Sequence, residues 1–508
     1  MTTASAVRSS TVDGVLARSA RRAPTAPALH FADRSWSYRK LDDAVTRAAA
    51  LLRSLGLPRG ARVAAYGRNS DAYLIAFLGC ARAGLVHVPV NYALTGEELR
   101  YLVAQSGSSA VLVDPGLREQ YDAAGLDVPL VLPLRDDAAS LLERVSAGPV
   151  PAHVLPEGEE PVGEHELVQL LYTSGTTSLP KGAMMTHRAF VHEYVSCIVG
   201  LRLAAEDRPL HPMPLYHSAQ MHVFLLPYLA LGAENRLLEA PEVPAVLAAI
   251  EEHGVDSVFL APTVWVPLAN HPEFAARDVS GLRKAFYGAS IMPGPVLARL
   301  REAMPGLQVF NCFGQSEIGP LATVLLPEEH DERPDSCGRP ALFVDVRVVD
   351  EDGVDVAPGG TGEVVYRSPQ LCEGYWEKPE ETAEAFRDGW FHSGDLVRID
   401  AGGYLTVVDR IKDVINTGGV LVASREVEDA LYTHEAVAEV AVIGTPDEKW
   451  IEAVTAFVVR RGEVAEADLI AHARSRLAGF KVPKRIVFVD DLPRNQSGKL
   501  LKRVLREQ

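Results

Sequence analysis

The chain has 508 residues, of which 47% are hydrophobic and 23% are charged, and its formal net charge is -17. This length exceeds one ordinary hydrophobic core, so two or more domains are expected. The composition is that of a globular protein rather than a disordered one. The acidic balance argues against a nucleic-acid-binding or anionic-membrane-binding surface.

The cysteines favour reduced thiols and a cytoplasmic setting, because they form an odd, unpatterned set without a C-x-x-C pair. They are Cys80, Cys197, Cys312, Cys337 and Cys372. No segment reaches the roughly 18 consecutive apolar residues of a membrane span. The arginine-bearing N-terminal segment contains no apolar core typical of a secretory signal. Whether the protein is a monomer or a homodimer stays open.

Short apolar runs alternate with segments of helical spacing over the first four hundred residues. Helices are expected over 38–56 and 243–254, each ending in a glycine. Buried strands are expected at 62–67, 84–90, 109–114, 256–262 and 284–289. This alternation predicts an α/β fold with layers built on parallel sheet.

The pattern of apolar and polar residues changes after about residue 334. Alternating segments at 344–353, 362–368 and 403–410 are bounded by Asp-Gly and Gly-Gly turns, which predicts a small β subdomain. The last hundred residues contain, in order, strand, strand, helix, strand and helix patterns. They predict a separate, compact α+β unit.

One loop has the composition of an anion-binding site. Residues 170–187, LLYTSGTTSLPKGAMMTH, place hydroxyl residues, glycines and Lys181 between an apolar run and a helix-like run. Backbone N–H groups, hydroxyls and a mobile ammonium together suit a polyphosphate. The loop is not the Walker pattern, because its lysine lies between Pro180 and Gly182. Taken alone, it could equally be an ordinary surface turn.

The stretch YTSGTTSLPKG resembles the phosphate-loop signature of the adenylate-forming superfamily, which contains acyl- and aryl-CoA synthetases, nonribosomal peptide adenylation domains and luciferases. Further stretches are similar to the family's motifs and follow in its order: PLYHSAQ, FYGASIMP, NCFGQSEIGP, GRPA, GEVVYRS with EGYW, WFHSGDL, VDRIKDVINTGG and PRNQSGKLLKRVLR. The chain is therefore identified as a member, most similar in texture to bacterial fatty-acyl-CoA synthetases.

The resemblance implies an N-terminal adenylation domain over 1–411 and a small mobile C-terminal domain over 412–508. It also implies ATP and Mg²⁺. The first reaction joins an acid to AMP and releases pyrophosphate, and the second transfers the acyl group to an acceptor such as CoA. Carboxylate and triphosphate repel each other, so cations and oriented donors should carry most of the catalysis.

The resemblance also assigns the nucleotide-binding residues by motif position. The phosphates would be held by Thr173, Ser174, Gly175, Thr176, Thr177 and Lys181. Mg²⁺ would be held by Glu317, since a carboxylate oxygen suits this hard ion. The adenine, ribose and remaining phosphate contacts would come from Gly288, Ala289, Ser290, Asn311, Gly314, Gln315, Ser316, Asp395, Arg410 and Lys499.

The implied catalytic set consists of Lys499, Glu317, Thr173 and His217. In the family, the lysine matched by Lys499 bridges the substrate carboxylate and the α-phosphate. His217 matches a gate beside the reacting carboxyl group, although a packed core histidine would also fit. Lys412 matches the hinge about which the small domain rotates.

Three departures concern the loop and the acceptor. Ser178 replaces the usual loop glycine and can still bind phosphate. Val420-Leu421 stand where the family usually has a Glu-Asn pair, and Ile451 replaces a usual glycine. Both of these positions flank the family's pantetheine channel, which their side chains could narrow. The segment 479–485, GFKVPKR, keeps the residues used against the CoA nucleotide.

The leading hypothesis is an ATP-dependent acid:CoA ligase. The alternative keeps adenylation but uses a carrier thiol, an amine or water as acceptor, or activates nitrite to diazotise an aromatic amine. An inactive binding protein would not need to retain Lys181, Glu317, Asp395 and Lys499 together. The identity of the acid substrate stays open. Candidate pocket residues are polar enough to suit an aryl or hydroxylated acid: His192, Glu193, His217, His222 and Trp265.

Overall fold

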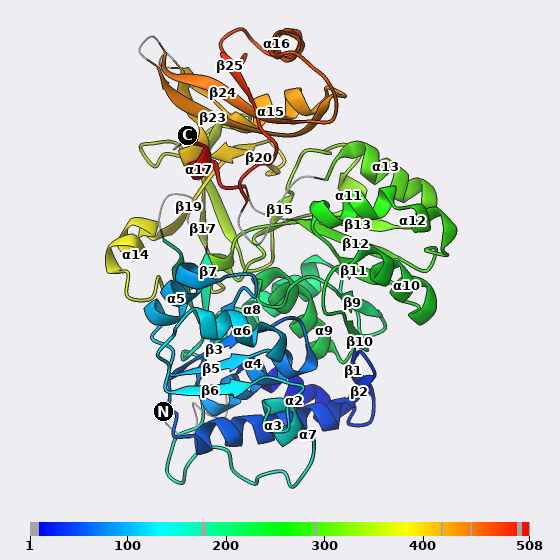
Figure 1. Ribbon diagram of the computed structural model, residues 1–508, viewed down its shortest axis with the longest axis vertical. Coiled ribbons are helices and arrows are strands. Elements are labelled where there is room, and N and C mark those ends of the chain that lie inside the picture. The colour runs from blue at the N-terminus through cyan, green and yellow to red at the C-terminus, as the bar shows by residue number, and fades with distance from the viewer. Residues whose placement is uncertain are drawn as a thin grey trace. The chain divides into compact units, whose positions relative to one another are not determined.

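The computed structural model describes residues 10–173, 179–288, 292–417, 420–447, 450–494 and 500–506, without the side chain of Arg503. The chain forms two compact units, whose elements are labelled in Figure 1. The first unit comprises Met1–Thr173, Pro180–Asp345 and Arg367–Gly389. The second comprises Ser174–Leu179, Val346–Tyr366 and Trp390–Gln508.

One sheet of the first unit has six strands in the order β6-β5-β3-β4-β7-β8. Its neighbours pair in parallel from β6 to β7, and β7 pairs antiparallel with β8. The central strand β4, Val-His-Val-Pro-Val, is buried at every position, as expected where both faces of a parallel sheet are covered. The strands are β3 (Arg62–Tyr66), β4 (Val86–Val90), β5 (Ala110–Val113), β6 (Leu130–Pro133), β7 (Leu167–Thr173) and β8 (Lys181–Thr186).

The other sheet of this unit has nine strands in the order β15-β14-β13-β12-β11-β9-β10-β1-β2. Its six middle strands are parallel, and antiparallel strands close both edges. The strands are β1 (Pro27–Phe31), β2 (Arg34–Ser37), β9 (Pro209–His211), β10 (Asn235–Leu237), β11 (Ser257–Phe259), β12 (Lys284–Gly288), β13 (Gln308–Phe313), β14 (Thr323–Leu325) and β15 (Arg339–Pro340); the unit also contains β18 (Phe386–Arg387).

Helices complete the core of the first unit. Helix α4 (Asp71–Ala83) is buried along nearly its whole length against α3 (Tyr38–Ser54), and Gly84 ends it at φ 68°. The other helices are α2 (Val12–Arg22), α5 (Gly96–Gln105), α6 (Arg118–Ala123), α7 (Leu141–Ser146), α8 (His187–Gly200), α9 (Leu226–Leu231), α10 (Val243–His253), α11 (Pro262–Asn270), α12 (Pro272–Ala276), α13 (Gly294–Ala303) and α14 (Pro379–Ala385), with short turns η1 (Pro115–Leu117), η3 (Ser316–Ile318) and η4 (Pro327–Glu329).

Two local features differ from the sequence pattern. The segment after the glycine-rich loop is not helical at once: Lys181–Thr186 forms strand β8, and α8 starts only at His187, capped by the Thr186 hydroxyl. Residues Ala219–Leu225 form a π-helix, η2, which continues into α9. Such wide turns are rare and are found mostly near functional sites.

The second unit contains two sheets. One pairs β16 (Asp345–Val349), β17 (Thr361–Arg367), β19 (Trp390–Ile399) and β20 (Leu405–Arg410). The other has the order β22-β21-β24-β23, with β25 beside β24. Its elements are η5 (Ile411–Asp413), β21 (Ile415–Thr417), β22 (Val420–Val422), α15 (Ser424–Tyr432), β23 (Val437–Asp447), β24 (Ile451–Arg460), α16 (Glu466–Arg474), β25 (Arg485–Phe488) and α17 (Lys502–Arg506).

The predicted α/β fold class is confirmed, with large layered sheets followed by a small α+β part. The five strands predicted in the first three hundred residues are present as β3, β4, β5, β11 and β12. Across the described part of the chain, no helix combines the length and apolar character required to cross a bilayer.

Candidate active site

A β-hairpin presents the glycine-rich loop at the edge of the six-stranded sheet. Thr173, the last residue of β7, pairs with Lys181, the first residue of β8. Thr173 and Lys181 are both half-buried. The expected phosphate ligands Ser174, Gly175, Thr176 and Thr177 lie outside the described residues, as does Ser178. The hairpin therefore fixes the two ends of the loop beside each other.

Tyr375 connects the lysine of this hairpin to the expected metal ligand. The Lys181 ammonium lies 5.1 Å from the centre of the Tyr375 ring, and the Tyr375 hydroxyl donates to Oε1 of Glu317 at 3.0 Å. Glu317 is buried in η3, which contacts both β7 and β8. Its carbonyl accepts from the Cys372 N–H at 2.8 Å. A cation and a carboxylate from separate motifs are thus held at one place.

The PLYHSAQ segment meets the same turn. The Ser218 and Ser316 hydroxyl oxygens are 3.1 Å apart and share a hydrogen bond. Ser316 directly precedes Glu317, and Ser218 follows His217, which is exposed. The structure thus brings the predicted gate residue to the segment next to the predicted metal ligand.

Two glycines leave room for close backbone approach at the ends of β12 and β13. A Cβ on Gly288 would lie 2.3 Å from the Cys312 carbonyl oxygen. Gly314 has φ 155°, and a Cβ there would lie 1.9 Å from the Pro320 carbonyl oxygen. Ala289 and Ser290, the other residues expected to support adenine, lie outside the described residues.

Asn311 and Gln315, two polar residues of the NCFGQSEIGP stretch, differ in whether their amide donors have partners. Asn311 is buried and donates from Nδ2 to the Ser336 carbonyl at 3.0 Å, so one of its two amide donors is already used. Gln315 has a buried Nε2 without a hydrogen-bond partner among the described residues. A buried donor left over beside Ser316 and Glu317 fits a nucleotide, which would supply the missing acceptor.

The described acidic residues fit a Mg²⁺ ion that is shared with substrate phosphates better than a metal ion held by protein side chains alone. No group of three or more His, Cys, Asp or Glu side chains in the described ranges could enclose an ion. Mg²⁺ is usually held by one or two carboxylates together with substrate phosphates. Glu317 beside the phosphate-loop hairpin matches that donor set.

The second unit contains the expected ribose contacts. Asp395 on β19 is 3% exposed, and its Oδ1 lies 2.6 Å from Nε of Arg410, its partner residue on β20. Arg410 also approaches the Ser393 carbonyl at 3.4 Å. The ion pair orients both side chains that the motifs assign to the ribose and phosphates.

The segment after Arg410 is anchored by polar contacts. Lys412 is exposed in η5, and Arg506 of α17 donates to its carbonyl and pairs with Asp413 at 2.9 Å. Asp409 Oδ2 accepts from the Ser424 N–H at 2.6 Å, at the start of α15. Lys499 lies outside the described residues.

The apolar substitutions near the expected acceptor path are exposed in this structure. Thr417 on β21 pairs with Val420 on one side and with Ile451 on the other. Ile451 is 61% exposed and Leu421 is 60% exposed. Ile451 also has φ 66°, a backbone conformation that a β-branched residue rarely adopts. A glycine would take this conformation without strain.

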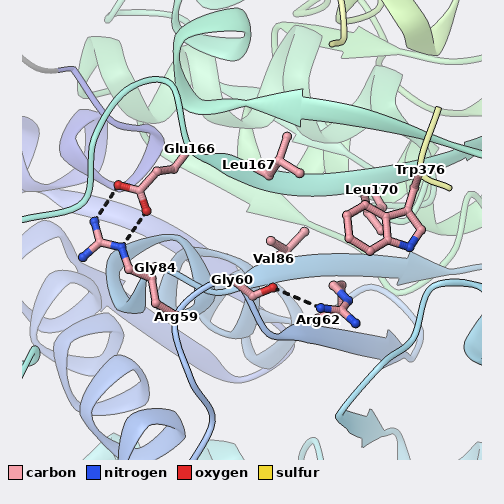
Figure 2. A pocket seen from close by; sticks show the side chains of 9 residues that line it. All are labelled: Arg59, Gly60, Arg62, Gly84, Val86, Glu166, Leu167, Leu170 and Trp376. Atoms are coloured by element: carbon pink, nitrogen blue, oxygen red, sulfur yellow. Dashed lines mark hydrogen bonds and ion pairs between the residues drawn. The ribbon is translucent and has the colours of Figure 1, made fainter. Parts of the chain in front are cut away.

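One cavity is lined by residues to which the motifs assign no role. It has a volume of about 210 Å³ and lies at the start of β3, β4 and β7. Figure 2 shows its lining, with the Arg59–Glu166 ion pair on one side and Trp376 at the other end. The glycine-rich loop follows the opposite end of β7. The cavity therefore lies at the other end of β7 from the loop to which the motifs assign the phosphates.

The other candidate substrate residues have structural partners. Trp265 is buried and donates to the Phe286 carbonyl at 3.1 Å. His222 is stacked on Phe190 and bonded to Tyr194 and Gln169, and burial lowers its pKa well below the usual value. His192 is half-buried and bonds the carbonyl one turn earlier in α8.

Some connecting residues were not predicted. Tyr375 lies in the EGYW stretch, so that motif carried a signal for it, although no role was assigned. Ser218 likewise lies in a quoted motif, PLYHSAQ, without an assigned role. Gln370 gave no comparable signal, because its importance depends on contacts with residues far away in the sequence.

Family models match most of the chain. The AMP-binding enzyme family matches residues 16–376, and the AMP-binding enzyme C-terminal domain matches residues 426–499. A feruloyl-CoA synthase of Amycolatopsis sp is 39% identical over 97% of each chain. A long-chain fatty acid–CoA ligase of Mycobacterium tuberculosis is 34% identical over 93% of each chain.

A solved structure agrees with these sequence matches. The ATP-bound structure of MatB from Rhodopseudomonas palustris has a TM-score of 0.87 and 30% identity, covering 98% of each chain. The resemblance drawn from the motifs is confirmed. The chain belongs to the AMP-binding enzyme family and is an AMP-forming ligase.

Proposed function

We propose that this protein is an ATP-dependent acid:CoA ligase that works through an acyl-adenylate. A carboxylate is a poor electrophile, and joining it to AMP supplies a good leaving group. The observation that carries the proposal is the Lys181–Tyr375–Glu317 arrangement at the base of the loop hairpin. It supports the proposal because a magnesium-bound triphosphate would need a cation and a carboxylate close together.

The residues that the motifs assign to the nucleotide would each bind a different part of ATP. Lys181, Thr173 and the loop residues would bind the β- and γ-phosphates. Gly288 and Gly314 would let the adenine approach the backbone, and Asp395 with Arg410 would bind the ribose. Mg²⁺, held by Glu317 and the phosphates, would neutralise charge on the triphosphate. Preorganised donors and cations of this kind lower the barrier most where charge develops.

The small domain completes the site in this proposal. Its boundary would fall between residues 411 and 412, with Lys412 as the hinge. Lys499 would enter the site to bridge the substrate carboxylate and the α-phosphate. His217, exposed beside Ser218, would gate the reacting carboxyl group. The five cysteines are all free, which supports a reducing, cytoplasmic setting.

CoA is the proposed acceptor because the relatives described above bear the names of CoA synthases and CoA ligases. A carrier thiol, an amine or nitrite chemistry has no better support among them. The 39% identity to a feruloyl-CoA synthase places aromatic acids first among the substrates to test.

Pyrophosphate release across a panel of hydroxycinnamic, benzoic, indolic and fatty acids, with and without CoA, tests this function. We expect release that depends on the acid and on ATP, and multiple turnovers only when CoA is present. Multiple turnovers with an amine or a carrier protein, but not with CoA, would contradict the CoA assignment.

A further inference from the structure

Glu193 is a fully buried carboxyl group that the proposed chemistry does not use. It lies on α8 and is 0% exposed. Its Oε1 accepts from the Leu321 N–H at 2.9 Å and from the Cys197 thiol at 3.3 Å. Its Oε2 accepts from Nε2 of Gln370. Burying a carboxyl group is costly, so three converging donors indicate a built polar site rather than chance packing.

Gln370 extends these contacts to the backbone of the turn after Glu317. Its Nε2 also approaches the Ile318 carbonyl at 3.3 Å and the Leu321 carbonyl at 3.2 Å. Its Oε1 accepts from the Ser196 hydroxyl at 2.6 Å, one turn along α8 from Glu193. The carboxyl and the amide therefore hold both ends of segment 318–321 against the helix.

Glycine at position 319 makes this contact tight. A Cβ there would lie 3.0 Å from Oε2 of Glu193. Gly319 has φ 107°, which favours glycine. The turn thus fits directly onto the carboxyl group, and a shift of Glu193 would be transmitted to the backbone beside Glu317.

The same helix continues from the strand that carries Lys181. Strand β8 runs from Lys181 to Thr186, and α8 begins at the next residue. One side of the contact is therefore tied to the phosphate-loop hairpin and the other to the expected metal ligand.

We propose that Glu193 is a positioning residue, which together with Gln370 sets the turn carrying Glu317 relative to the phosphate-loop hairpin. This inference rests on the proposed roles of Glu317 and Lys181. Glu193 touches neither nucleotide nor acid; it acts through the turn. The step it supports is the binding of magnesium-bound ATP for adenylation.

The ionised form of Glu193 is the better acceptor for these three donors. Burial raises its pKa to about 8. Cys197 and Tyr194 on its own helix, and Cys312 on β13, are the titratable groups facing it, and burial raises the pKa of each of them as well. The contact should therefore tighten as the pH rises through about 8.

The variant Glu193→Gln tests the proposal, with Tyr194→Phe as matched control. Gln keeps the size but replaces one acceptor by an NH₂ group that faces donors. Tyr194 is the next residue of the helix, equally buried, and its hydroxyl bonds His222 instead. The readouts are KM for magnesium-bound ATP and kcat in acid-dependent pyrophosphate release at pH 7 and pH 9, with the melting temperature of each variant.

At pH 9 we expect Glu193→Gln to raise KM for magnesium-bound ATP about 10-fold or more, the lower end of the effect of losing a hydrogen bond to a charged group. At pH 7 the rise in KM should be smaller, because the protonated carboxyl group of the wild-type enzyme resembles the amide of the variant. Tyr194→Phe should leave KM unchanged. Ser196→Ala, which frees Gln370 without touching Glu193, should raise KM in the same direction.

A KM within twofold of wild type in Glu193→Gln at pH 9, or an equal rise in Tyr194→Phe, would overturn the positioning role. If Glu193→Gln does not fold, an unchanged KM in Ser196→Ala would overturn it instead. A wild-type enzyme with no acid-dependent pyrophosphate release would defeat the proposed function itself, so the two failures are distinguishable.

Discussion

Single side chains from distant motifs meet in this protein through one tyrosine. Lys181 and Glu317 are 136 positions apart in the sequence, and Tyr375 contacts both. The ring presents its face to the ammonium and its hydroxyl to the carboxylate, so it holds two opposite charges without neutralising either. In the proposed function, both charges would then serve a triphosphate and its metal ion.

Tyr375→Phe separates these two contacts. The ring remains under Lys181, and the hydrogen bond from its hydroxyl to Glu317 is lost. A hydrogen bond to a charged group contributes about 1.5–3 kcal/mol. We expect a higher Mg²⁺ requirement in pyrophosphate release at saturating ATP. Tyr375→Leu, which removes both contacts, should also weaken ATP binding. A wild-type Mg²⁺ titration in Tyr375→Phe would refute the link to Glu317.

Asp395→Ala should weaken ATP binding, because the carboxylate that Arg410 orients would no longer accept the ribose hydroxyls. Each lost charge-assisted hydrogen bond costs about 1.5–3 kcal/mol. Arg410 is 34% exposed, so water can solvate it after the loss of its partner. Asp352→Ala, in an exposed turn of the same unit, is the control. Unaltered ATP KM and kcat in Asp395→Ala would rule out the ribose role.

The motifs assigned roles to Lys181, Glu317, Asp395 and Arg410 because each lies in a motif with a fixed order. Sequence reasoning could not identify Glu193 as part of the Glu317 turn. That contact joins α8 to residues 318–321 and 370, and nothing local in α8 signals it. Its burial depends on tertiary packing, which one sequence does not display.

At the ends of strands, glycines allow two backbone segments to lie closer together than a side chain would permit. Gly314 follows β13 with φ 155°, beside the Pro320 carbonyl. The alternation of apolar runs and helical spacing predicted the parallel strands well. It missed β8, because Lys181–Thr186 is too short and mixed to show a period of two, and it missed the π-helix, whose width depends on neighbours.

Gly314→Ala tests the close approach. Its Cβ would meet the Pro320 oxygen at 1.9 Å, so the backbone beside Gln315 must move. We expect the free energy of unfolding to fall by about 2 kcal/mol or more, with weaker ATP binding. Gly306→Ala is the control, because nothing lies within 4 Å of its Cβ position. Equal melting temperatures for the two variants would contradict the packing argument.

Ile451 bears on the second half-reaction, the proposed transfer of the acyl group to CoA. Ile451 is exposed with a positive φ, in the region expected to guide the acceptor thiol. If its side chain narrows that path, adenylate formation should be fast and transfer to CoA slow. The two steps are separable because they use different domain orientations in the family.

Ile451→Gly should speed thioester formation from isolated adenylate and leave pyrophosphate exchange unchanged. It should also raise the melting temperature slightly, since a left-handed conformation costs a non-glycine residue about 1–2 kcal/mol, partly offset by glycine's flexible unfolded chain. Ile451→Ala separates the causes: it removes bulk but keeps the strain. Fast wild-type transfer, unchanged in both variants, would mean that Ile451 does not limit the acceptor path.

A single-turnover experiment with excess enzyme decides whether the protein is an acyl-adenylate-forming CoA ligase. The enzyme is mixed with ATP labelled at the α-phosphate and with an acid that the pyrophosphate-release panel has shown to be a substrate. CoA is left out at first and added later. The account predicts that each ATP first gives one acyl-AMP and one pyrophosphate, and that added CoA then converts the acyl-AMP to AMP and acyl-CoA. The Lys499→Ala variant should form neither acyl-AMP nor pyrophosphate. Formation of ADP, or an acyl-AMP that CoA does not consume, would contradict it.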